Sequence, residues 1–296
     1  MIRFDSPARA ALRNFAASSV ALAALAVLLL LAGAALLAPW LAAQNPYDLT
    51  QLDLMDARQP PGAAAAGLPG HHYWLGTDEQ GRDMGAAILY GLRTSLVVGL
   101  ASTALALLIG VLLGLAAGYA GGRVDALLMR IVDVQLSFPA MLIALVLLAA
   151  LGQGLGKIVS ALVAVQWAYY ARTTRSAALV ERRKEYIEAA RMQGLSPLRI
   201  LLGHLLPNCL PPVLVVAALQ VAAAISLEAT LSFLGLGLPI TEPSLGLLIA
   251  NGFQHLMSGR YWISFFPGLA LLLLIVCINL VADQMRDVFN PRLQKQ

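Results

Sequence analysis

The sequence predicts an all-α integral membrane protein with six transmembrane helices. Of its 296 residues, 59% are hydrophobic and only 12% are charged, and the mean hydropathy is +0.75, well above what the near-even apolar share of soluble domains gives. Charge-free windows long enough to cross a bilayer recur along the chain. Lysine and arginine gather in alternate loops between these windows, as they do in multi-pass proteins.

Six apolar windows define the predicted spans. Residues 16–41 form the first, a retained anchor helix, because this uncharged run exceeds the roughly 7 to 15 residues of a signal-peptide core. The other windows are 94–122, 134–156, 158–171, 200–227 and 261–282. Because the 158–171 window has only 14 residues, this span is expected to continue past Arg172 and Arg175, whose long side chains can snorkel to the interface.

The basic residues predict that both termini lie in the cytoplasm. With that orientation, 15 of the 20 Lys and Arg residues lie in cytoplasmic segments and five in exported ones, which satisfies the positive-inside rule. The predicted order is a cytoplasmic N-tail with the anchor helix (1–43), an exported loop (44–93), a five-helix core (94–285) with a cytoplasmic loop at about 172–208, and a cytoplasmic C-tail (286–296).

The cytoplasmic loop at 172–208 carries seven of the 20 positive charges and is predicted to hold two short helices. Residues 185–193 are good helix formers, and Gly194 can supply a left-handed C-terminal stop. Ser196 then provides a hydroxyl N-cap, and Pro197 is a proline at the first helical position. The pattern therefore predicts a helix, a sharp glycine corner and a second helix.

The second short helix is predicted to present one apolar stripe. Leu198, Leu201, Leu202 and Leu205 follow the i, i+3, i+4, i+7 spacing of one helix face. Pro207 and the pair Pro211-Pro212 are expected to interrupt this helix. Spacing alone leaves two functions open, an interfacial helix lying against lipid head groups or a docking helix for a partner protein.

The order of residues in this loop resembles the EAA loop of bacterial ABC importer permeases. The residues that carry the resemblance are Glu188, Ala189, Ala190, Gly194, His204 and Pro207. Further stretches also resemble the second permease of the peptide/nickel importer family: "LGTDEQGRD" (75–83), "GLRTSL" (91–96), "GYAGGRVD" (118–125), "LEATLSFLGLG" (227–237) and "MRDVFNPRL" (285–293). One departure is "GRDMGAAILYG", where family members usually place a Ser-Arg pair near residues 85–87.

The resemblance implies a type I ABC importer permease fold, in which the short helix of the loop seats in a groove of an ATP-binding subunit. The residues that would form this coupling corner are Tyr186, Glu188, Ala189, Ala190 and Gly194. His204 and Pro207 would join the corner to the fifth span. Small residues suit such a corner because they allow close approach of another backbone.

The resemblance also implies partners in a bacterial inner membrane. These are a homologous second permease, two ATP-binding subunits that use ATP and magnesium, and a periplasmic or lipid-anchored substrate-binding protein. This chain is expected to contact membrane lipid but no nucleic acid, and to bind no cofactor of its own.

The sequence does not complete the motifs for catalysis or metal binding that parts of it suggest. "LGQGLGKI" lacks the Gly that a P-loop needs at Leu151 and the Ser or Thr that it needs at Ile158. His71 and His72 have no further ligand cluster nearby in the sequence, so they are interpreted as loop histidines and no metal site is predicted. No Ser/Lys dyad, HExxH motif or paired aspartates lie within the spans, so the chain is expected to be a non-catalytic subunit.

The expected substrate is a di- or oligopeptide. Nickel or another metal chelate, glutathione or another small solute are alternative substrates for the same architecture. A stand-alone secondary transporter is a more distant alternative.

Gln166 and Gln220 are placed at mid-bilayer, roughly 12 and 15 Å along their spans at 1.5 Å per residue. Each is either an interhelical hydrogen-bond partner or part of a polar translocation path. Glu228 is placed near the outer interface, either packed there or at the mouth of the path.

Overall fold

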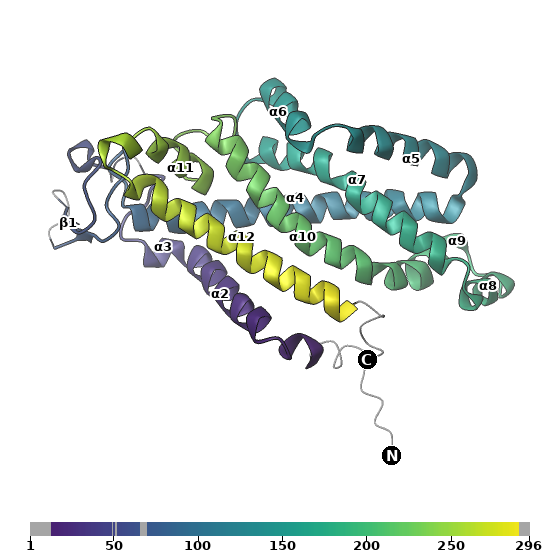
Figure 1. Cartoon of the computed structure of the whole chain (residues 1–296). Coiled ribbons are helices and arrows are strands. Elements are labelled where there is room, and N and C mark those ends of the chain that lie inside the picture. The colour runs from purple at the N-terminus through teal and green to yellow at the C-terminus, as the bar shows by residue number, and fades with distance from the viewer. Residues whose placement is uncertain (1–12, 49, 51, 66–69, 290–296) are drawn as a thin grey trace, which may run out of the picture.

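The computed structural model describes residues 13–48, 50, 52–65 and 70–289, and its long helices form an elongated bundle (Figure 1). The long helices are α2 (Ser19–Leu36), α4 (Met84–Ala120), α7 (Leu155–Glu181), α10 (Leu206–Phe233) and α12 (Trp262–Phe289). One end, here the hairpin end, carries the antiparallel strands β1 (Ala63–Ala64) and β2 (His72–Tyr73) together with η2 (Leu54–Asp56), α11 (Leu245–Phe253) and η4 (Leu256–Ser258). The opposite end, here the α8 end, carries α8 (Glu185–Met192) and α9 (Pro197–Ile200).

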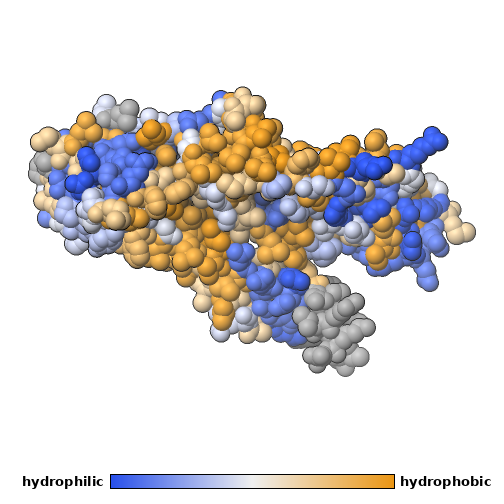
Figure 2. Space-filling view, turned by 45° about the horizontal axis from the view of Figure 1, so that its top comes forward, coloured by the Kyte–Doolittle hydropathy of each residue, from blue (hydrophilic) through white to orange (hydrophobic). Residues whose placement is uncertain are grey.

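The surface of the bundle is that of a membrane protein. Figure 2 shows apolar side chains covering the middle of the molecule and hydrophilic ones gathered toward its ends. By length and hydropathy, four of the described helices can cross a membrane: α2, α4, the continuous Pro197–Phe233 helix and α12. A bent pair of helices raises this number to five. The 27 residues of α7 rise roughly 40 Å, which is long enough for a sixth span. α7 is nevertheless not apolar enough to be counted with the other four helices.

Three glycines bring α4 and α7 into unusually close contact. A Cβ at Gly110 would lie 2.5 Å from the carbonyl oxygen of Trp167, and one at Gly114 would lie 2.5 Å from that of Ala171. One at Gly118 would lie 2.6 Å from the Cβ of Ala178. Small residues four apart on one helix face let two backbones approach within a membrane, where van der Waals packing rather than the hydrophobic effect drives association. The glycines of α4 therefore determine how closely α7 lies beside it.

The bounds of the third predicted span, residues 134–156, are wrong. α5 (Gly122–Ser137) and α6 (Ala140–Leu151) meet at an angle of 90°, and Pro139 stands as the N-cap of α6. Because proline disfavours a helical conformation of the residue before it, the chain turns at Phe138, which is extended (ψ 144°). An uncharged window measures composition and does not detect this change of direction.

α7 continues past Arg172 and Arg175, as predicted from its short apolar window. The arginines reach carboxylates of α5 rather than lipid alone. Arg175 donates from Nη2 to Asp125 Oδ2 at 2.6 Å, and Arg172 forms an ion pair with Asp133. These pairs hold the amphipathic α5 against the half of α7 nearest the α8 end.

The prediction of a second short helix interrupted by prolines is also wrong. α9 passes into a π-helical turn, Leu201–Leu205, labelled η3, and then directly into α10, which contains Pro211 and Pro212 in its interior. The predicted leucine stripe does not hold either, because Leu198 and Leu202 are exposed. The extra residue of the π turn shifts the helix phase, and the buried positions are Ile200, Leu205, Cys209 and Val213.

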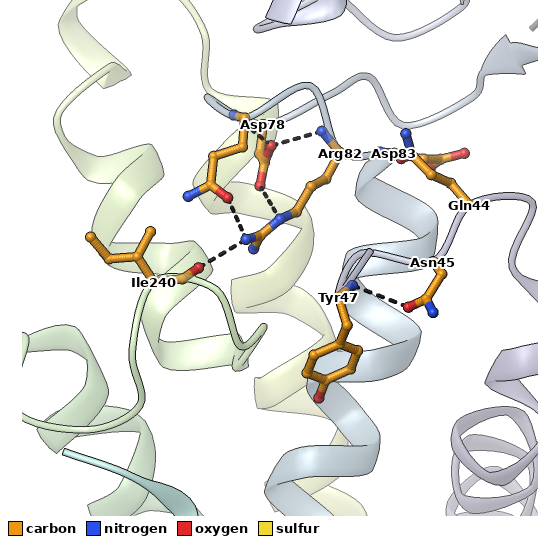
Figure 3. Close-up of polar contacts among 8 residues, drawn as sticks. Gln44, Asn45, Tyr47, Asp78, Arg82, Asp83 and Ile240 are labelled. Carbon is orange, nitrogen blue, oxygen red and sulfur yellow. Dashed lines mark hydrogen bonds and ion pairs between the residues drawn. The ribbon is translucent and has the colours of Figure 1, made fainter. Parts of the chain in front are cut away.

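At the hairpin end, α4 begins at Met84, ten residues before the predicted span. The loop that precedes α4 is joined to the rest of the bundle by a buried arginine (Figure 3). Arg82 is 1% exposed, donates from Nη2 to the carbonyl oxygen of Ile240 at 2.8 Å and lies beside Asp78. Burial lowers the pKa of Arg82 and raises that of Asp78 from their ordinary values, while the attraction between the two charges opposes both shifts. The Gln44 side chain accepts a hydrogen bond from the Asp83 N–H at 2.8 Å, so the segment that follows α3 (Ala38–Leu41) joins the same cluster.

We predict that Gly114→Leu destabilises the fold by roughly 1–3 kcal/mol, because its side chain would have to displace the backbone of α7. Gly268→Leu is the matched control, since a Cβ at Gly268 in α12 has no heavy atom within 4 Å. Thermal unfolding in detergent measures both variants. An equal loss in the two variants would contradict the role assigned to the α4–α7 contact.

Candidate functional site at the α8 corner and the α7–α10 groove

α8 is held on the bundle by one face. Ile187 and Ala190 are buried in the same apolar cluster as Ile200 and Leu205. The Tyr186 hydroxyl donates to Glu181 Oε2 at 2.6 Å. Burial, together with this hydrogen bond, raises the pKa of Tyr186, which keeps the hydroxyl protonated as a donor. The short helix is therefore attached rigidly to the end of α7.

The sharp corner after α8 is built as predicted. Gly194 has a φ of +72°, the left-handed conformation that glycine adopts at little cost. The N–H of Leu195 donates to Ala190 O at 3.2 Å, and the N–H of Gly194 donates to Arg191 O at 3.0 Å. These two bonds form the Schellman motif that ends a helix. A Cβ at Gly194 would have nothing within 4 Å, so backbone conformation rather than space restricts this position.

The other face of α8 is open. Glu188 and Ala189 are exposed, whereas Ala190, also in the predicted coupling set, is buried. Met192 at the tip of α8 is 90% exposed, and the sequence analysis did not single it out. The sequence signal for Met192 was its position as an apolar residue next to a glycine corner in a charged loop.

His204 and Pro207 lie where the corner joins α10. The N–H of Leu206 donates to Leu201 O, which makes the π turn. Pro207 has no N–H to donate to the preceding turn and its ring crowds that turn, which a widened π turn accommodates. The Asn208 side chain donates to His204 O at 2.7 Å and supports the junction. π turns often occur at functional sites in helices, and this one separates the α8 corner from the body of α10.

A groove of about 390 Å³ lies between α6, α7 and α10. Its polar lining residues are Gln166, Tyr169, Gln220, Ser226 and Thr230. Gln166 donates from Nε2 to Gln220 O at 2.9 Å, so the two predicted path residues lie together. Ser226 and Thr230 were not predicted; their signal was the presence of hydroxyls further along the helix that carries Gln220.

Glu228 lies apart from this groove. Its side chain is fully buried, Oε2 accepts from Ser95 Oγ at 3.1 Å and Oε1 accepts from Ser232 Oγ at 2.7 Å. The carboxyl therefore joins α4 to α10 inside the protein. The assignment of Glu228 to the translocation path stays a prediction, while its observed contacts hold helices together.

Comparison with known families decides what this arrangement belongs to. Residues 110–295, which contain the α8 corner and the groove, match the family described as the binding-protein-dependent transport system inner membrane component. The chain belongs to this family. Residues 6–61 match the N-terminal TM domain of oligopeptide transport permease C. The resemblance to importer permeases drawn from the sequence motifs is thereby confirmed.

Several curated relatives align over nearly the whole chain. The di/tripeptide transport system permease protein DppC of Pseudomonas aeruginosa (strain UCBPP-PA14) is 37% identical, with 98% of this chain and 94% of that protein covered. The dipeptide transport system permease protein DppC of Bacillus subtilis (strain 168) is 35% identical, with 96% and 85% covered. The probable D,D-dipeptide transport system permease protein DdpC of Escherichia coli (strain K12) is 39% identical, with 86% and 81% covered.

A solved structure confirms the predicted type I importer permease fold, but not the predicted count of six spans. A chain of the inward-facing MetNI methionine ABC transporter superposes with a TM-score of 0.55 at 21% identity, covering 68% of this chain and 96% of that chain. The chain is therefore a multi-pass permease with the type I ABC importer permease fold.

We predict that Glu228→Ala lowers stability by roughly 2–4 kcal/mol, because it leaves the Ser95 and Ser232 hydroxyls without their acceptor and opens a cavity. Glu228→Gln keeps the shape and one carbonyl acceptor and is expected to lose much less. Thermal unfolding in detergent measures both. A loss as large in the Gln variant as in the Ala variant would show that the carboxyl group does more than join the helices.

Proposed function

We propose that this chain is a transmembrane permease subunit of an ATP-driven, binding-protein-dependent peptide importer. The observation that carries the proposal is the α8 corner, a rigid short helix with an open outer face at one end of a permease fold. Relatives named as dipeptide and di/tripeptide permeases favour a peptide substrate. The chain forms the translocation path with a homologous second permease and receives its substrate from a periplasmic or lipid-anchored binding protein.

In this proposal the α8 end faces the cytoplasm and the hairpin end faces the exported side of a bacterial inner membrane, with both termini in the cytoplasm. The seven basic residues of the α8 loop support that orientation. Two ATPase subunits bind ATP and magnesium and carry out hydrolysis. This chain contributes no catalytic group and no cofactor.

The geometry supplies a route for coupling. Glu188, Ala189 and Gly194 present the open face to an ATPase subunit, and Tyr186 and Ala190 fix that face to the bundle. When the ATPases close, movement of the corner reaches α10 through the π turn at His204 and Pro207. α10 carries Gln220, which lines the groove with Gln166. Closure at the corner would therefore reshape the groove.

We predict that Gly194→Val lowers substrate-stimulated ATP hydrolysis and uptake roughly tenfold, because a β-branched residue at a φ of +72° distorts the corner. Gly194→Asn is the matched control, since asparagine tolerates the left-handed conformation. The assay uses the two permeases, both ATPases and the binding protein in proteoliposomes. Full activity of the Val variant would leave α8 as an interfacial helix without a coupling role.

We predict that Ala189→Arg weakens attachment of the ATPase subunits at least tenfold, because a long charged side chain would stand on the open face of α8. Ala189→Ser changes the same position with little added volume and should bind normally. Co-purification of the ATPases with the permease pair, titrated against ATPase concentration, measures the effect. Normal attachment of the Arg variant would place the ATPase contact elsewhere.

A further inference from the structure

Among the described residues, none that lines the groove between α6, α7 and α10 is charged, and the polar groups of the groove are unevenly divided between donors and acceptors. Ser226 Oγ donates to Ala222 O at 2.9 Å, and Thr230 Oγ1 donates to Ser226 O at 2.8 Å. Both hydroxyl protons are thus directed to the backbone of α10. What these residues offer to a ligand is the lone pairs of their oxygens.

Gln166 strengthens this imbalance. Its Nε2 is engaged by Gln220 O, and its Oε1 is buried with no hydrogen-bond partner among the described residues. The residue is 2% exposed, so the unpaired oxygen has little access to water. A buried acceptor without a donor costs roughly 1–3 kcal/mol. A ligand that brings an N–H group to this oxygen would recover that cost.

We propose that the groove holds the peptide backbone during passage, by accepting hydrogen bonds from peptide N–H groups at Gln166 Oε1, Ser226 Oγ and Thr230 Oγ1. This inference rests on the proposed function. Gln220 and Tyr169, whose side chains can also donate, supply the complementary partners for peptide carbonyls. Because no charged side chain lines the groove, side-chain charge is not recognised there, and substrates that share only a backbone can pass.

The same acceptor-rich chemistry argues against other ligands for this groove. A phosphate would meet acceptor oxygens with no cation to neutralise it, and its desolvation would go uncompensated. A lipid acyl chain would fill the apolar part of the groove and leave Gln166 Oε1 unpaired. A peptide supplies N–H donors at regular intervals, and its backbone is neutral between the charged termini.

The test measures maximal transport rates of two peptides, trialanine and its backbone N-methylated analogue, in the complete reconstituted complex with each peptide delivered on saturating binding protein. N-methylation removes the donor, and Gln166→Leu removes the acceptor, so the four rates form a double-mutant cycle. We expect Gln166→Leu to lower the trialanine rate roughly three- to tenfold, the range for loss of one hydrogen bond. The rate of the N-methylated analogue and the concentration of loaded binding protein at half-maximal rate should not change.

Gln135→Leu is the matched control. Gln135 also donates from its amide to an α7 carbonyl, Ala164 O at 2.8 Å, but it does not line the groove. It should leave the ratio of the two peptide rates as in the wild type. Equal slowing of both peptides by Gln166→Leu, or assembly of the permease pair lost in this variant alone, would overturn the inference and assign Gln166 to packing or to the second permease. Wild-type complex that moves neither peptide would overturn the proposed function itself.

Discussion

The close approach of α4 and α7 is the constraint on which the remaining structure depends. Gly110, Gly114 and Gly118 let the two backbones meet, and any side chain there would meet a carbonyl or a Cβ of α7. Once α7 lies in that position, its far side reaches α10 through Gln166, and its last turn reaches α8 through Glu181. The groove and the α8 corner are both attached to the same helix.

α10 connects the two functional regions from the other side. It begins beyond the π turn next to the α8 corner and passes the groove with Gln220, Ser226 and Thr230. Near its end at Phe233, Glu228 accepts a hydrogen bond from Ser95 of α4. α10 is continuous through Pro211 and Pro212, as the proposed transmission of movement along its axis requires. In the proposed coupling, the π turn Leu201–Leu205 is the point where this helix would change its angle to the α8 corner.

At the hairpin end, geometry is maintained by a buried charge rather than by apolar packing alone. Arg82 reaches Ile240, 158 residues away in the chain, and binds its carbonyl oxygen. The Trp262 indole N–H donates to Thr77 O at 3.2 Å and links the same loop to α12. The buried Arg82–Asp78 pair itself adds little net stability. The ends of α4, α10 and α12 are thus tied to one loop.

The sequence by itself determined the membrane class, the glycine corner after α8, and the presence of amides at the level of the groove, because hydropathy, left-handed glycine stops and helical rise are local properties. Only the tertiary structure decided the 90° turn at Phe138, the unbroken helix through the prolines, and the burial of Glu228. The burial of Glu228 depends on a neighbour distant in the chain. Ser95, which satisfies Glu228, lies 133 residues away, and a window of residues along one helix contains no information about such a partner.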